Sequence, residues 1–248
     1  MGRIKAVLKG IMSRLPGRNN EATRSKWIER TLQEIPKGSR ILDAGCGEQQ
    51  FRKFCSHLNY VGQDFAGYDG KGDQRGLQTG SWDQTKLDIV CDIVSVPEPD
   101  NSFDAILCTE VLEHVVDPVA VLREFSRLLK PQGYLILTAP FCSLTHFAPY
   151  HFSTGFNHYW YSSHLQALGF SVLEIAANGN FFEYLAQEIR RNSFMAKRYA
   201  SPPAAALSVV AYYLLGLPFI CVLGLLSSGD RGSSEVLCFG YHVFARRL

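Results

Sequence analysis

The chain has 248 residues, of which 46% are hydrophobic and 19% charged, and its formal net charge is +2 at pH 7. This length suffices for one α/β domain with a well-filled core and additional segments, and the near-neutral charge does not predict nucleic-acid binding. The seven cysteines are scattered without a Cys-x-x-Cys pair. That pattern argues against a disulfide framework and a zinc site, and it is consistent with a reduced, cytoplasmic protein.

The first twenty residues carry a basic amphipathic pattern. Apolar residues recur at helical spacing within residues 4–15, and basic residues lie between them. Because charges interrupt the apolar residues, the segment is not a secretory signal. It predicts a short helix that either binds an anionic membrane surface or packs on the domain.

Strand and helix patterns alternate from residue 21 onward. Helices are predicted over residues 21–34, 51–55, 117–129, from 157, and over 181–191. Strands are predicted at residues 41–43, 60–62, 87–90, 103–107, 134–138 and 169–177. This alternation is typical of a parallel sheet with right-handed crossovers. Ligands bind at the carboxyl ends of such strands, so we expect the loops after the first four strands to converge.

The most specific motif follows the first strand. There Ile41-Leu42 continues into Asp43-Ala44-Gly45-Cys46-Gly47, and a second acid, Asp64, ends the next strand. The glycines allow a tight turn and close approach of a ligand. An acid about 20 residues further on is placed to accept hydrogen bonds from ribose hydroxyls. The motif therefore predicts a nucleoside site.

Two departures from the dinucleotide motif indicate which nucleoside is bound. The third glycine of Gly-x-Gly-x-x-Gly is replaced by Gln50, and Asp43 lies where a pyrophosphate would be repelled. An acid suits a ligand that carries an amino group and a sulfonium. The motif therefore favours S-adenosylmethionine (SAM) over NAD or FAD.

A longer series of segments resembles the class I SAM-dependent methyltransferases, close to the type 11 group. The segments ILDAGCG, YVGQD, CDIVSVPEPDNSFDAILCTEVLEHV and LREFSRLLKPQGYLILTAPF match that family in order and spacing over residues 22–180. The resemblance implies an α/β, Rossmann-like, seven-stranded, mostly parallel sheet whose last strand, residues 238–246, is antiparallel. The expected divisions are an N-terminal segment (1–20), a SAM-binding domain (21–180), a helical apolar insertion (181–235) and the last strand (236–248).

The resemblance assigns roles in cofactor binding to the glycine motif. Gly45, Cys46 and Gly47 would line the methionine part of SAM. Asp43 would lie near its amino group, and Asp64 would bind the ribose.

The resemblance assigns further cofactor contacts to the third and fourth strands. Asp92 would accept a hydrogen bond from the exocyclic amine of adenine, and Ile93 would pack on its ring. Thr109, Glu110 and His114 would border the cofactor. An alternative is that His114, with the acid before it, is only structural.

The chain departs from the family pattern in two places. Gln49 replaces a third glycine that these enzymes often carry, which narrows the loop without excluding SAM. The loop over residues 64–85 is longer than usual, and its Phe65, Tyr68 and Trp82 are placed to fold over a substrate.

The segment over residues 140–160 is expected to lie over the transferred methyl group. Methyl transfer depends mainly on positioning and desolvation, but a neutral hydroxyl acceptor also needs a general base. We expect His146 or His151 to be that base, although each is alternatively structural. The aromatic residues expected to contact substrate are Tyr150, Phe152, Phe156 and Tyr159. The histidines are too unevenly spaced for a metal site, so none is predicted.

An uncharged apolar run over residues 204–228 lies within the C-terminal insertion. It is long enough to span a bilayer, which takes about 20 apolar residues. However, the return of the last strand to the sheet requires both ends of the run to lie on one side of the membrane. Gly216-Leu217-Pro218 interrupts the run, which favours a helical hairpin or kinked helix in the cytoplasmic leaflet. The flanking cations are Lys197, Arg198 and Arg231. Alternatively, the run packs on the sheet or forms a dimer interface.

Together these features predict a SAM-dependent methyltransferase in the cytoplasm, bound to the inner face of a membrane through residues 204–228 and the N-terminal helix. The product of the cofactor would be S-adenosylhomocysteine. The expected acceptor is a small molecule, a lipid-linked intermediate or a glycan, methylated on oxygen. No nucleic-acid partner is expected, because the sequence lacks a basic stripe interleaved with aromatic residues. The alternatives are an NAD-linked oxidoreductase and a SAM-binding scaffold without catalysis.

Overall fold

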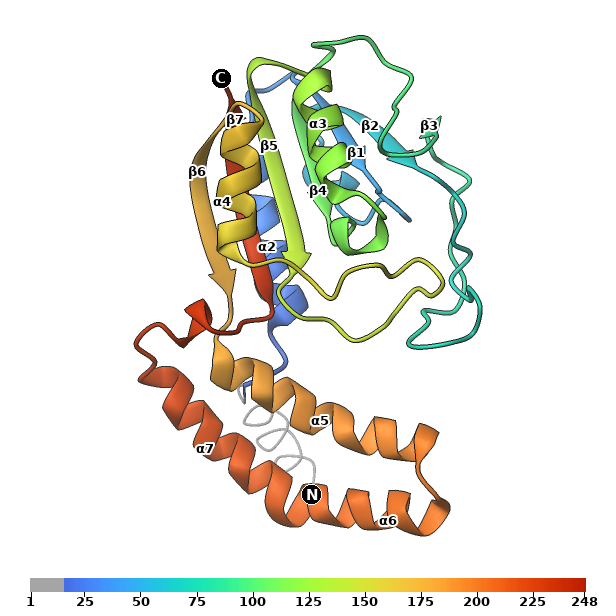
Figure 1. Ribbon diagram of the computed structural model, residues 1–248, viewed down its shortest axis with the longest axis vertical. Coiled ribbons are helices and arrows are strands. Elements are labelled where there is room, and N and C mark those ends of the chain that lie inside the picture. The colour runs from blue at the N-terminus through green and yellow to red at the C-terminus, as the bar shows by residue number, and fades with distance from the viewer. Residues whose placement is uncertain (1–15) are drawn as a thin grey trace. The chain divides into compact units, whose positions relative to one another are not determined.

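The seven strands form one sheet of order β3-β2-β1-β4-β5-β7-β6 (Figure 1). The computed structural model describes residues 16–248, so the predicted N-terminal helix lies outside the described residues. The strands are β1 (Arg40–Ala44), β2 (Asn59–Asp64), β3 (Ile89–Val90), β4 (Phe103–Thr109), β5 (Leu129–Pro140), β6 (Phe170–Asn178) and β7 (Gly240–Arg247). β1 pairs in parallel with β2 and β4, whereas β7 is antiparallel to β5. The predicted mostly parallel sheet with an antiparallel last strand is confirmed.

The central strands are apolar because both faces of the sheet are covered. Leu42 in β1 pairs with Val61 on one side and Ile106 on the other, and its side chain is fully buried. α2 (Asn20–Leu32) lies behind the sheet, while α3 (Pro118–Leu128) and α4 (His158–Ala167) lie in front of it (Figure 1).

α3 begins where the sequence predicts it. The Asp117 carboxylate accepts hydrogen bonds from the backbone N–H groups of Val119 (3.0 Å) and Ala120 (2.9 Å), and Pro118 occupies the first helical turn. An acid at the cap followed by proline satisfies the free N–H groups of a helix start.

The connections at the β1–β3 side of the sheet contain less regular structure than predicted. Between β1 and β4, the described chain has one 3₁₀ turn, Arg52–Phe54, in place of the predicted helix over 51–55. The third strand is also shorter than the predicted residues 87–90. The Asp88 N–H donates to the Gly62 carbonyl at 2.9 Å, but the Asp88 carboxylate, and not a backbone carbonyl, accepts the Gly62 N–H at 2.8 Å. Regular strand pairing therefore starts only at Ile89.

The chain forms two compact units. One contains residues 24–176 and 240–248 and holds most of the sheet. The other contains residues 177–239 together with the described residues before Arg24. Its helices are α5 (Phe181–Tyr199), α6 (Pro202–Ala211), a π-helical turn (Tyr212–Gly216) and α7 (Leu217–Ser228), followed by a 3₁₀ turn (Ser233–Glu235).

The apolar run is one continuous helix, so the predicted helical hairpin is wrong and the kinked-helix alternative describes it better. The Leu217 N–H donates to the Tyr212 carbonyl, which is the wider π-type bond. A π turn relaxes the backbone where Pro218 removes a donor and crowds the preceding turn, so the helix continues instead of breaking. Pro202–Ser228 is long and apolar enough to cross a membrane by length and composition.

Candidate active site

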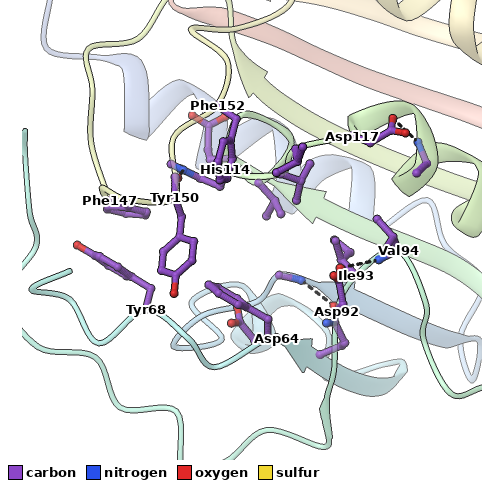
Figure 2. A pocket seen from close by; sticks show the side chains of 18 of the residues that line it. Asp64, Tyr68, Asp92, Ile93, Val94, His114, Asp117, Phe147, Tyr150 and Phe152 are labelled. Carbon is purple, nitrogen blue, oxygen red and sulfur yellow. Dashed lines mark hydrogen bonds between the residues drawn. The ribbon is translucent and has the colours of Figure 1, made fainter. Parts of the chain in front are cut away.

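A cavity of about 490 Å³ lies at the carboxyl ends of the parallel strands (Figure 2). All four loops that were predicted to converge supply wall residues: Gly45 follows β1, Phe65 follows β2, Asp92 follows β3 and Glu110 follows β4. The remaining wall residues are Gln63, Asp64, Tyr68, Trp82, Ile93, Val94, Val111, His114, Val115, Val116, Asp117, Ala120, Phe147, Tyr150 and Phe152.

The glycine turn after β1 is tightly packed. Gly45 and Gly47 have left-handed backbone angles (φ +71° and +51°), which glycine adopts without strain. A Cβ on Gly45 would lie 2.6 Å from the Val111 side chain, and one on Gly47 would lie 2.9 Å from Trp82. Within the described chain, Gly45 lines the cavity, whereas Gly47 and Cys46 do not.

Two acids face the cavity from neighbouring strand ends. The Asp64 carboxylate accepts hydrogen bonds from the Gly47 N–H (2.9 Å), the Ala66 N–H (3.0 Å) and the Gln84 amide (3.2 Å). The Asp92 carboxylate accepts one from the Val94 N–H at 3.1 Å, and Figure 2 shows Ile93 beside it. These bonds fix the direction of both carboxylates.

Asp43 lies outside the cavity wall. Its carboxylate is buried and accepts a hydrogen bond from the Tyr60 hydroxyl at 2.6 Å, and its other oxygen has no hydrogen-bond partner among the described residues. Burial, opposed in part by the Tyr60 bond, raises the pKa of Asp43 to about 7. Thr109 is likewise buried and does not belong to the wall of the described cavity.

Glu110 lines the cavity and contacts residues of β5 and α2. Its backbone has a left-handed φ of +54°, which is uncommon for a residue other than glycine. The carboxylate pairs with the Arg24 guanidinium at 2.8 Å and accepts a hydrogen bond from the Thr138 hydroxyl at 3.0 Å. Strained backbone held by several contacts is common at functional sites.

His114 presents an imidazole to the cavity (Figure 2). The Tyr150 carbonyl lies 2.5 Å from Nδ1, and because a carbonyl only accepts, Nδ1 carries the proton. Nε2 is buried near the Glu113 carboxylate and has no hydrogen-bond partner in the described part of the chain. Burial and the nearby His146 lower the pKa of His114 to about 3. The ring is therefore neutral near pH 7, with its lone pair on Nε2.

The two histidines predicted as bases pack against His114 and, of the residues described, are not among those that line the cavity. The ring centroid of His146 lies 4.5 Å from that of His114, and that of His151 lies 5.9 Å away. His146 Nδ1 is 2.8 Å from the Leu144 carbonyl, and His151 Nε2 is 3.1 Å from the Ser143 hydroxyl. The fold thus brings the three rings together and turns His114 toward the cavity.

Glu113 is fully buried beside two of these histidines. Its Oε1 lies 3.6 Å from His114 Nε2 and 3.9 Å from His146 Nε2, and neither carboxylate oxygen has a hydrogen-bond partner among residues 16–248. Burial is the main cause that raises the pKa of Glu113 well above its ordinary value. One ligand atom from each of Glu113, His114 and His146 falls within 4.8 Å of the others, and these types can bind zinc. The sequence spacing did not indicate this cluster, which forms only in the folded chain. The prediction that the protein binds no metal can be tested there.

The predicted substrate residues fall into two groups. Tyr150 and Phe152 line the cavity. Phe156 is buried and packs on Trp160, with ring centroids 4.4 Å apart. Tyr159 lies on α4 and is 71% exposed. Neither Phe156 nor Tyr159 lines the described cavity. The Asn157 side chain caps α4 between these two residues and fixes where the helix starts.

An aromatic cluster from two distant segments forms another part of the wall. Tyr68 and Trp82 come from the long loop, and Phe147 stacks on Tyr68 at 4.6 Å and lies edge-on to Trp82 at 5.3 Å. Sequence reasoning missed Phe147, although it lies in the aromatic segment over 140–160. The missed aliphatic wall residues, such as Val111 and Val115, resembled ordinary core positions.

Comparisons with curated proteins and with a family model agree with this geometry. The model of a family described as "Methyltransferase domain" matches residues 17–197. The chain is 36% identical over 104 residues to the ubiquinone biosynthesis O-methyltransferase of Xanthomonas oryzae, covering 41% of this chain and 43% of the relative. It is 31% identical over 114 residues to the probable tRNA methyltransferase 9B of Homo sapiens, covering 44% and 23%. The chain thus matches less than half of the length of these curated relatives.

Solved structures show the same fold. A SAM-dependent methyltransferase from Archaeoglobus fulgidus superposes with a TM-score of 0.55 at 16% identity, covering 92% of this chain and 94% of the other. A geranyl diphosphate methyltransferase superposes with a TM-score of 0.52 at 13% identity, covering 92% and 78%.

Proposed function

This chain belongs to the methyltransferase-domain family and is a class I SAM-dependent methyltransferase, and we propose that it methylates an oxygen atom of a small-molecule, lipid-linked or glycan acceptor. Family membership argues against the alternatives of an NAD-linked oxidoreductase and of a scaffold without catalysis. The observation that carries the proposal is a single cavity with two acids on one part of its wall and a neutral histidine among aromatic rings on another.

The residues of the cavity fit SAM. Asp64 lies at the end of β2 beside the glycine turn, and its carboxylate has acceptor capacity beyond the three donors that orient it, which suits the ribose hydroxyls. Asp92 and Ile93 offer an acceptor and an apolar surface for adenine. Gly45 lines the cavity, as Glu110 does, and its backbone would border the methionine part.

When bound, SAM supplies an electrophilic methyl group on a positively charged sulfur. The aromatic wall of Tyr68, Trp82 and Phe147 excludes water from the reacting groups, which strengthens their electrostatic interactions. We infer that His114 Nε2, which is buried 3.6 Å from Glu113 Oε1 in this structure, accepts the proton of the acceptor hydroxyl after the ring turns toward the acceptor. Its low pKa is sufficient, because methylation makes that hydroxyl strongly acidic, so even a weak base can remove the proton.

Two arguments favour oxygen over nitrogen as the methylated atom. An aliphatic amine arrives protonated near pH 7, and His114 with its lowered pKa is too weak a base to remove that proton beforehand. In addition, several curated relatives are named as O-methyltransferases. We place the enzyme in the cytoplasm, where free cysteines persist, and favour a lipid-linked acceptor because of the apolar helix Pro202–Ser228.

The test uses SAM labelled on its methyl group. The protein is incubated with separated membrane and soluble extracts of its source cells, and products are partitioned between organic and aqueous phases. Label in the organic phase, carried by a methoxy group in the isolated product, is the expected result. A methylated amine would contradict the oxygen assignment, and label only in the aqueous phase would contradict the lipid-linked one. The His114→Gln variant, which retains the shape of the side chain without a base, serves as the control.

A further inference from the structure

We propose that the apolar helix, defined as the continuous helix Pro202–Ser228, lies flat in one leaflet of a membrane, with its exposed side among the lipid chains and α5 on the water side. This inference rests on the helical unit alone and does not depend on the identity of the methyl acceptor. It concerns how the protein binds a membrane, and it differs from the simplest arrangement, in which the apolar helix would span the bilayer.

The apolar helix is unusually exposed for its composition. It has no charged residue, yet only 11% of its most apolar stretch is buried, which distinguishes it from the core helix of a soluble protein. Leu207, Leu214 and Leu225 are 68–74% exposed and recur along one side of the helix. Such a continuous apolar surface marks an interaction site.

The opposite side of the apolar helix packs on α5. Ile220 and Leu223 are buried there against Ala186 of α5. This contact fixes which side of the apolar helix remains available to a partner.

Polar contacts tie α5 to the apolar helix along its length in an antiparallel arrangement. The Asn180 amide donates to the Ser227 hydroxyl at 2.9 Å, near the start of α5 and the end of α7. The Asn192 amide donates to the Ser208 hydroxyl at 3.0 Å, near the other end. The two helices therefore enter or avoid a membrane together.

α5 cannot lie in the hydrocarbon core. Between these polar contacts, Arg190 donates to the Tyr212 hydroxyl at 3.3 Å, and Arg191 pairs with Glu188 at 2.6 Å. A spanning apolar helix would place these charges near the centre of the bilayer, where charged side chains are costly. A helix lying parallel to the surface keeps them in water.

The far end of α5 has the chemistry of a membrane interface. Lys197 and Arg198 are exposed beside Phe194 (51% exposed) and Tyr199 (64% exposed). Cations attract anionic headgroups, and aromatic residues favour the headgroup region. We therefore infer a lipid surface that contains anionic headgroups as the partner, in preference to a second copy of this chain.

Binding is tested by flotation of the full-length protein with vesicles of phosphatidylcholine and phosphatidylglycerol. The triple variant Leu207→Glu/Leu214→Glu/Leu225→Glu is expected to lose vesicle binding by about tenfold or more, because binding scales with buried apolar area. Leu248→Glu is the matched control, since Leu248 is also 71% exposed but lies at the C-terminus. SAM binding by each variant shows that it is folded.

Depth distinguishes a flat helix from a spanning one. Single cysteines are placed at positions 207, 214 and 225 after Cys91, Cys142 and Cys221 are changed to serine, and each is labelled with an environment-sensitive dye. Lipids that carry a quencher near the headgroup are expected to quench all three labels equally. If the label at position 214 alone lay too deep for this quencher, the helix would span the bilayer, and the proposal would be overturned.

Two further results would also overturn it. Absence of vesicle binding by the wild-type protein would exclude the membrane as the partner. A stable dimer that dissociates in the triple variant would show that a second copy covers this surface. Neither result would affect the proposed methyl transfer, which the labelling assay measures separately.

Discussion

The Asp64 carboxylate accepts a hydrogen bond from the Gly47 N–H at 2.9 Å, so the acid that ends β2 also holds the glycine turn that follows β1. The two parts of the sequence motif are thus one structural unit. A change in the acid affects both the expected ribose contact and the position of the turn.

We predict that Asp64→Asn weakens SAM binding by about 10- to 100-fold, because hydrogen bonds to a charged group contribute about 1.5–3 kcal/mol. Isothermal titration calorimetry measures the change. Asp88→Asn is a matched control, since Asp88 accepts the Gly62 N–H at 2.8 Å but does not line the described cavity. Equal losses in both variants would show that Asp64 acts only by holding the backbone.

His114→Gln is expected to lower kcat by about 10²- to 10⁴-fold, which is the typical contribution of a general base. The glutamine amide can still donate to the Tyr150 carbonyl, so SAM binding should persist. His146→Gln and His151→Gln should have smaller effects, because these rings pack against His114. Steady-state kinetics of the three variants decides among them, and a larger loss in either of the latter would restore the sequence-based assignment.

The pH dependence of kcat gives a separate test of His114. Its pKa, lowered to about 3 by burial and His146, keeps the ring neutral between pH 5 and 8. We therefore expect no inflection in kcat near pH 6.5, the ordinary value for histidine. An acid limb at that pH that disappears in His114→Gln would contradict the neutral imidazole.

Asp43→Asn is expected to stabilise the fold at neutral pH. The folded pKa of about 7 lies above the ordinary value of 3.8, so between these values the unfolded state loses its proton first and is favoured. The stability cost of Asp43 is therefore absent below about pH 4 and complete above about pH 7, and each unit of pKa difference corresponds to about 1.4 kcal/mol.

Urea unfolding at pH 5 and pH 8 measures this difference. Asp104→Asn supplies the opposite case, because hydrogen bonds from Lys130 and the Arg40 N–H outweigh partial burial and lower the pKa of Asp104. That variant should lose stability at pH 8. An Asp43→Asn variant less stable than wild type at pH 8 would contradict the raised pKa of Asp43.

Trp82 should report ligand binding by its fluorescence. It lines the cavity and packs over Gly47, whereas Trp27 is buried on His242 and Trp160 lies on α4. Trp82→Phe is therefore expected to lose most of the change in emission on addition of SAM, and Trp160→Phe to retain it. The reverse pattern would place the ligand elsewhere.

The sequence alone determined the sheet, the glycine turn and the acids at the strand ends, because these depend on local patterns. Strand periodicity, glycine spacing and caps such as Asp117-Pro118 act within a few residues. Gln49 is an instructive case, since it stands where the family resemblance led us to expect a glycine. Its φ is +58°, and its side chain donates to the Lys86 carbonyl at 2.6 Å.

Only the tertiary structure decided which side chains face the cavity. The sequence does not distinguish His114, His146 and His151 from one another. In the structure, His114 lines the cavity, whereas His146 and His151 pack against His114. Asp43 belongs to the motif yet is buried on Tyr60, and the apolar run continues through Pro218 because a π turn absorbs the lost bond. Side-chain direction and burial arise from contacts between distant segments, and those contacts leave no periodic pattern in the sequence.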